Sequence, residues 1–206
     1  MLGSPLSRLA GPLALAAGAL IIVAQLLWLP FDPDDHVATA TDPVFQTGNV
    51  IYLVGFCVLM LALIAAYGWI ADKAGGLGLI GVVVAIVGTM LLGGDLWFET
   101  FAISWIADDA PDLLDADDPS TLLAIGAVSS YLLFAVGWIL FGIASFRARV
   151  FPSAICVAIV VGGAIGFMAL LAPFGIPLGL AVAWLGVWMM RTATGQISHP
   201  DPEQAP

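Results

Sequence analysis

Two carboxylates and one imidazole give this sequence its clearest candidate for metal chemistry. Asp95 and Glu99 are four residues apart, so on a helix they share one face. His36 lies in an earlier acidic stretch. Two carboxylates with an imidazole suit a divalent cation, and the sequence predicts a metal site formed by Asp95, Glu99 and His36. The alternative is that the two carboxylates lie on a solvated helix face at the membrane surface.

Uncharged polar side chains interrupt three otherwise apolar stretches and form a second candidate site. They occupy corresponding ends of those stretches, so they could line one polar pocket for a small solute. The alternative is that they form hydrogen bonds between helices, each contributing roughly 0.6–2 kcal/mol in a membrane. The candidate pocket residues are Gln25, Asn49, Tyr52, Ser130 and Tyr131.

The elements that must position these residues are membrane-spanning helices. The chain has 206 residues, of which 61% are hydrophobic and 10% charged, whereas a soluble domain carries about 25% charged residues. Apolar stretches of the length that a bilayer requires recur along the chain. The sequence predicts an all-α integral membrane protein, a six-helix bundle with spans at about residues 10–29, 47–70, 77–95 (with an interfacial extension to 107), 121–145, 151–169 and 172–190.

Charge asymmetry predicts how this bundle faces. All five basic residues fall beside one set of helix ends: Arg8, Lys73, Arg147, Arg149 and Arg191. Twelve of the fifteen carboxylates fall beside the other set. Because Lys and Arg mark the cytoplasmic side, we expect both termini in the cytoplasm and a location in the cytoplasmic membrane. A basic patch for nucleic acid is absent from the sequence, so nucleic acid is excluded as a partner.

The first span has a signal peptide as its alternative, because Arg8 precedes the apolar stretch and Ala38-Thr-Ala40 follows it. Signal peptides carry apolar cores of about 7–15 residues with cleavage close behind. Here the stretch is longer and an acidic, proline-containing segment intervenes, which favours a retained span. We therefore expect one membrane domain over residues 1–191, followed by a disordered cytoplasmic tail, 192–206.

The sequence contains no recognisable catalytic motif. The sequence has no HExxH or GxSxG motif, and no cofactor fingerprint. Cys57 and Cys156 are interpreted as small buried hydrophobes. Two small-residue motifs, Gly162-x-x-x-Gly166 and Gly175-x-x-x-Gly179, allow close helix approach. They predict internal packing or, alternatively, self-association or a protein partner bound through the glycine faces.

Residues 137–166 carry a family resemblance. The Gly137-Trp138 pair, Gly142, the Arg-x-Arg turn, Pro152 and the glycine-rich helix that follows resemble small polytopic membrane proteins of actinobacterial type, a family of unknown function. The resemblance implies a six-helix bundle and no established activity. We expect a non-enzymatic accessory or scaffold protein with an acidic outer face, without a cofactor. The alternative is binding or transport of a small solute or cation through the outward-facing polar pocket.

Overall fold

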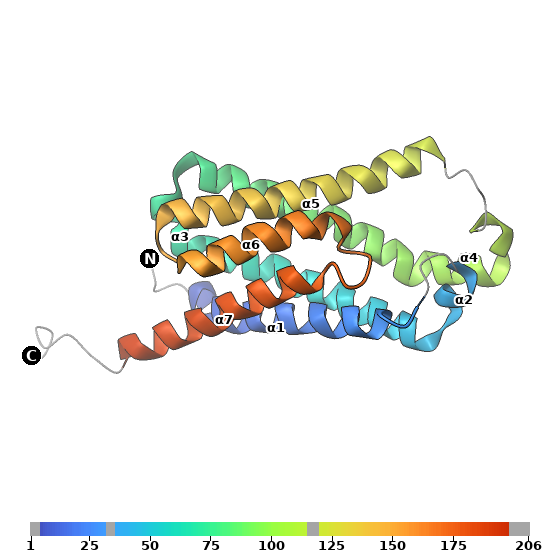
Figure 1. Cartoon of the computed structure of the whole chain (residues 1–206), viewed down its shortest axis with the longest axis horizontal. Helices are drawn as coiled ribbons and strands as arrows, with labels where there is room; N and C mark the ends of the chain where they lie inside the picture. Colours follow the sequence, from blue (N-terminus) through green and yellow to red (C-terminus); the bar gives the residue numbers. More distant parts are fainter. Residues whose placement is uncertain (1–4, 32–35, 115–119, 198–206) are drawn as a thin grey trace, which may run out of the picture.

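The computed structural model describes residues 5–31, 36–114 and 120–197, and within them every regular element is helical. The long helices form the bundle, and short helical elements lie in the connections between them (Figure 1). In chain order they are α1 (Pro5–Trp28), α2 (His36–Thr41), α3 (Pro43–Phe98), a π-helical turn (Glu99–Ile103), α4 (Ser104–Asp109), a 3-10 turn (Pro111–Leu113), α5 (Thr121–Ala148), α6 (Ser153–Ile165), a 3-10 turn (Gly166–Met168) and α7 (Ile176–Ile197).

Helix α3 consists of two antiparallel arms that meet at Gly75. The backbone there has φ 56° and ψ −156°, a conformation that is essentially restricted to glycine. Figure 1 shows the chain reversing direction at this point. We call residues 43–74 the first arm and residues 76–98 the second arm. The break explains why one continuous apolar segment supplies two of the predicted spans.

Replacing Gly75 by Ala should lower the free energy of unfolding by about 1–3 kcal/mol, because a Cβ atom disfavours this backbone conformation. Neither Gly75 nor its neighbour Gly76 has an atom within 4 Å of the place that a Cβ would occupy. Gly76→Ala is therefore a matched control without a conformational penalty. Thermal unfolding in detergent should show a lower Tm for Gly75→Ala alone. Equal Tm values for the two variants would show that the backbone conformation at position 75 does not require glycine.

Four segments of the described chain are long and apolar enough to cross a membrane: Arg8–Trp28, Pro43–Asp109, Thr121–Ala148 and Ile176–Thr194. The second is 67 residues long and contains the reversal at Gly75. The segment Ser153–Met168, which covers α6 and its 3-10 turn, is a shorter apolar helix. The predicted all-helical, multi-pass membrane fold is confirmed at this level.

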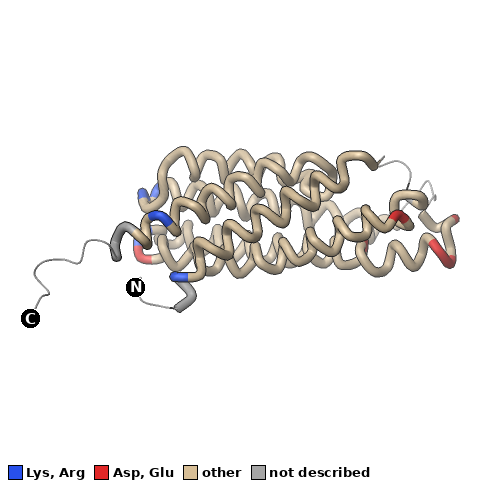
Figure 2. Tube along the Cα trace, turned by 90° about the horizontal axis from the view of Figure 1, so that it is seen from below, with Lys and Arg blue, Asp and Glu red and all other residues tan. Residues whose placement is uncertain are grey.

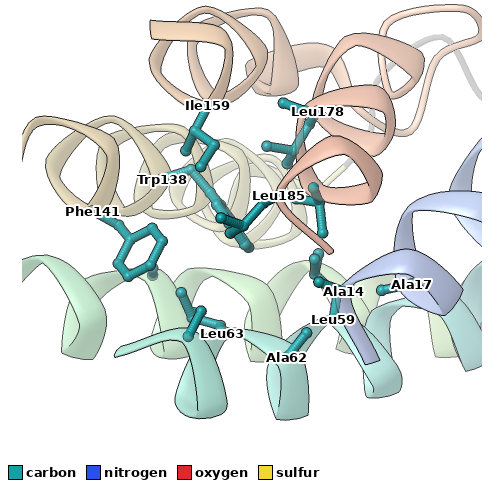
Figure 3. Packing of buried hydrophobic residues seen from close by; sticks show 14 of the residues in the cluster. Ala14, Ala17, Leu59, Ala62, Leu63, Trp138, Phe141, Ile159, Leu178 and Leu185 are labelled. Carbon is teal, nitrogen blue, oxygen red and sulfur yellow. The ribbon is translucent and has the colours of Figure 1, made fainter. Parts of the chain in front are cut away.

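The helices close into a ring in which α1 packs on α3 and α7, α5 packs on α3 and α6, and α6 packs on α7. Apolar side chains from these helices meet at the centre of the ring. Figure 3 shows several of them, from Ala14 and Ala17 of α1 to Leu178 and Leu185 of α7. Because no water is released when helices meet in lipid, close van der Waals packing must hold such a ring together.

Glycines make that close packing possible. A Cβ atom at Gly18 of α1 would lie 2.7 Å from the Ala183 nitrogen of α7, and one at Gly186 of α7 would lie 2.7 Å from the Gly11 carbonyl of α1. The two glycine motifs of the sequence also face inward. Gly162 contacts Leu178, Gly166 contacts Phe134, Gly175 contacts Tyr52 and Gln25, and Gly179 contacts Gly18 and Ile21. Internal packing accounts for all four glycines, and these faces are not available to a partner.

Charge divides the two ends of the bundle (Figure 2). Lys and Arg lie at the end where α1 begins and α7 ends, and most described Asp and Glu lie at the opposite end. We call these the basic end and the acidic end. Asp72 is the described carboxylate that precedes Lys73 at the Gly75 reversal. The separation of basic from acidic residues that the sequence predicts is therefore present in the folded bundle.

Three expectations need revision. The connection between α6 and α7 is longer than predicted, because α7 begins at Ile176 and not near residue 172. Pro173 lies in this connection, and its bond to Ala172 is cis. Cys57 is exposed, not buried, whereas Cys156 is buried as expected. Helix α7 also continues to Ile197, into the predicted tail; residues 198–206 lie outside the described chain.

Candidate functional site

Gln25 and Tyr52, two of the predicted pocket residues, bind one short segment of backbone. The segment is the connection between α6 and α7, residues 166–175, which we call the α6–α7 turn. Gln25 donates from Nε2 to the Ala169 carbonyl at 2.8 Å and accepts at Oε1 from the Gly175 N–H at 3.0 Å. The Tyr52 hydroxyl donates to the same Ala169 carbonyl at 2.7 Å. Both side chains are fully buried.

Helix periodicity explains how these two side chains reach the turn. Gln25 lies four residues after Ile21 on the buried face of α1, and Tyr52 lies four residues before Phe56 on the buried face of the first α3 arm. The turn approaches so closely that a Cβ at Gly175 would lie 2.6 Å from the Tyr52 hydroxyl oxygen and 2.8 Å from Gln25 Cδ. For Gln25 and Tyr52, the hydrogen-bonding interpretation is therefore the one that the structure supports.

Asn49 and Trp28 present unpaired polar atoms in the same half of the bundle. Asn49 is 2% exposed and its Oδ1 has no hydrogen-bond partner among the described residues; the same holds for Nε1 of Trp28. The Trp28 ring stacks on Phe45 at 5.5 Å and meets Tyr52 edge-on at 4.9 Å. An unpaired buried polar group costs roughly 1–3 kcal/mol. One acceptor and one donor are thus open to hydrogen bonding.

Trp28 was missed by the sequence analysis. The signal that could have found it is its spacing, because it lies three residues after Gln25 and therefore on the same side of α1. A Trp at the end of an apolar stretch is more often an interfacial anchor, so this spacing alone did not mark it as a site residue. The structure buries it beneath Phe45, where the first α3 arm begins.

A second group of predicted residues gathers where the second α3 arm faces α5. The Ser130 hydroxyl lies within hydrogen-bonding reach of the Asp95 carboxylate and 3.0 Å from the Gly126 carbonyl. Oδ2 of Asp95 is buried without a described partner. Asp95 and Glu99 both act electrostatically on the Tyr131 hydroxyl, and Glu99 is exposed. We call Asp95, Glu99, Ser130 and Tyr131 the outer acidic cluster.

The predicted metal site is only partly described. Among the described residues, no group of three or more His, Cys, Asp or Glu side chains lies close enough to hold a metal ion. The backbone of His36 begins α2, but its side chain lies outside the described part of the chain. A cation bound here would rely on the Asp95 and Glu99 carboxylates, and the three-residue site stays a prediction.

The aromatic extension after Asp95 is a continuous helical segment with one irregular turn. The second α3 arm passes through the π-helical turn into α4, and Trp97, Phe101 and Trp105 are exposed along it. Trp97 and Phe101 contact each other with ring centroids 5.6 Å apart. The Ser104 hydroxyl donates to the Ala40 carbonyl of α2 at 3.2 Å. The acidic end therefore presents a row of large aromatic side chains beside its carboxylates.

These features define an all-helical, multi-pass membrane protein with two polar clusters near its acidic end. Comparison of the chain with protein-family models, with curated proteins and with solved structures gave no match. Its function must therefore be argued from the geometry above.

Proposed function

We propose that the chain crosses the cytoplasmic membrane six times, with both termini in the cytoplasm. The support is the arrangement of α1, the two α3 arms, α5, α6 and α7, which run back and forth between a basic and an acidic end (Figures 1 and 2). Positive charge beside short loops favours the cytoplasmic side. A fluorescent reporter fused after Pro206 should be active in the cytoplasm, and a periplasmic phosphatase reporter fused after Leu113 should be active outside. The reverse pattern would refute this orientation.

We infer that the protein acts without enzymatic chemistry, as an accessory or scaffold protein that presents its acidic end to a partner. The observation that carries this inference is how the interior polar groups are used. Gln25 and Tyr52 bind the protein's own backbone, and Trp138 donates to Thr89 across the α3–α5 interface at 3.2 Å. The resemblance of residues 137–166 to polytopic proteins without an established activity is consistent with this function.

The exposed aromatic and acidic side chains at the acidic end are suited to binding a partner. Trp97, Phe101 and Trp105 are exposed at the acidic end, and Trp, Tyr and Phe are enriched where proteins meet. The carboxylates beside them favour a partner with a basic segment at the membrane surface, because opposite charges attract within about 10 Å at moderate salt. The partner is thus defined by charge and by an aromatic contact.

A photo-crosslinking residue at Trp105 tests this role in intact cells. The control is the same crosslinker at Leu79, an exposed position near the basic end of the second α3 arm. We expect a discrete adduct from position 105 that disappears when Trp97 and Phe101 are both replaced by Ala, and no such adduct from position 79. Mass spectrometry then identifies the adduct. Equal adducts from both positions, or none from position 105, would exclude a partner at this end.

A second candidate function is binding of a small solute or cation from the acidic side. Three unpaired buried atoms favour it: Trp28 Nε1, Asn49 Oδ1 and Asp95 Oδ2. For a cation, we expect a divalent metal to raise the Tm of the wild-type protein, with a smaller rise in Asp95→Asn and in Glu99→Gln because each loses one carboxylate charge. A thermal-shift titration measures this. Identical responses in all three proteins would discard the cation site.

A further inference from the structure

The α6–α7 turn differs in composition from the other connections at the acidic end. Residues 166–175 read GFMALLAPFG and contain no charged or hydrogen-bonding side chain, whereas residues 29–46 and 108–120 carry many carboxylates. Four large apolar side chains of the turn are exposed on the protein: Phe167 (44%), Met168 (41%), Leu171 (41%) and Phe174 (38%). A turn in water would normally use polar turn formers as well as Gly and Pro. This one has a surface suited to hydrocarbon.

Helix lengths place the turn below the acidic surface. From Arg191 to Ile176, α7 rises about 22 Å at roughly 1.5 Å per residue, whereas the hydrocarbon layer is about 30 Å thick. From Arg8 to Trp28, α1 rises about 30 Å by the same measure. Figure 1 shows the turn ending short of the level that α5 and the α3–α4 segment reach. The basic ends of these helices lie together, so the difference in length falls at the acidic side.

Much of the backbone of the turn is hydrogen-bonded within the protein. At hydrocarbon depth, non-helical backbone must find its partners inside the protein. Gln25 and Tyr52 supply partners for the Ala169 carbonyl and the Gly175 N–H. Four further N–H groups donate to carbonyls three residues earlier, at 2.9–3.0 Å: those of Ala169, Leu171, Phe174 and Ile176. The buried Gln25 side chain thus supplies the hydrogen bonds that water would supply to a solvent-exposed turn.

We propose that the α6–α7 turn is immersed in the outer leaflet, where its apolar side chains contact lipid acyl chains. This inference rests on the six-crossing orientation proposed above. Phe167, Met168, Leu171 and Phe174 form the contact surface, and the Gln25–Tyr52 pair holds the turn at that depth. The α6–α7 hairpin therefore ends deeper in the membrane than α1 and α5 do. The Tyr131 ring, 6.2 Å from Phe167, lies at the edge of the contact surface.

Depth measurement with nitroxide labels tests the immersion. Leu171→Cys and Phe174→Cys place labels on the turn, and Leu113→Cys places one on the exposed 3-10 turn after α4. Each is made in a Cys57→Ala, Cys156→Ala background and reconstituted in phosphatidylcholine vesicles. We expect collisions with oxygen to exceed collisions with a water-soluble nickel chelate at 171 and 174 by several-fold, and the opposite preference at 113.

The three positions separate the ways in which the inference could fail. A preference for nickel at 171 and 174, with nickel also preferred at 113, would place the turn in water and overturn its immersion while leaving the six-crossing orientation intact. A preference for oxygen at 113 would place the acidic end in lipid and overturn the proposed six crossings. All three substituted side chains are exposed, so the labels do not disturb the packed core.

Discussion

Replacing Gly137 by Ala should destabilise the bundle by about 1–3 kcal/mol, the usual penalty for adding a methyl group to a well-packed contact. Gly137 of α5 lies against the backbone of Ala85 in the second α3 arm, and a Cβ atom would overlap that backbone. A rigid helix backbone cannot move aside as a side chain could. The two helices would have to separate, and the packing of Trp138 and Phe141 beside them would loosen with them.

Gly126 on the same helix provides the matched control. Nothing lies within 4 Å of the place that its Cβ would occupy, so Gly126→Ala keeps only the gain in helix propensity, up to about 1 kcal/mol. The two identical substitutions should therefore shift the Tm in opposite directions, as measured by thermal unfolding in one detergent. If both variants were stabilised, the close approach of α5 to the second α3 arm would be wrong.

Gln25→Leu should lower the free energy of unfolding by about 1–3 kcal/mol, because it leaves a buried N–H without an acceptor. The Gly175 N–H bonds to Gln25 Oε1, and Leu offers nothing in its place. Tyr52→Phe should have a smaller effect, about 0.5–1.5 kcal/mol, since the Ala169 carbonyl would still accept from Gln25. Chemical denaturation in mild detergent gives both values.

The double variant separates this explanation from simple loss of packing. With both side chains replaced, the Ala169 carbonyl loses its second donor as well as its first. The effect should therefore exceed the sum of the single effects, with a coupling of about 0.5 kcal/mol or more. Strict additivity would mean that the two residues do not share this carbonyl in solution.

Much of the fold was predictable because a membrane imposes strong rules on a sequence. Helix length follows from bilayer thickness, and the separation of basic from acidic ends follows from where Lys and Arg lie along the chain. The reversal at Gly75 was placed correctly as a short basic turn at Lys73, because glycines beside a charge interrupt two apolar stretches. The position of the last turn was not predictable to the residue, since residues 162–180 contain no polar side chain to mark where one helix ends.

The sequence singled out Gln25 and Tyr52 as interior polar residues, but it did not indicate what they bind. Gln25 and Tyr52 stand out because polar groups are costly in lipid. What they bind is a backbone carbonyl and an N–H more than a hundred positions away, and backbone groups leave no trace in a sequence pattern. The pairing of Ser130 with Asp95 depends likewise on how α5 rotates against the second α3 arm. Cys57 was misplaced for the same reason, because nothing local distinguishes its face of the helix.

The contact between α1 and α7 has a consequence for biosynthesis. Among the described helices, α1 carries Gly11 and Gly18 and is synthesised first, whereas α7 carries Gly179 and Gly186 and is synthesised last. The ring therefore stays open at one side until α7 has been synthesised. The partners of Gln25, Ala169 and Gly175, are synthesised just before α7. Helix α7 therefore closes the ring, and it does so directly after the turn that Gln25 binds.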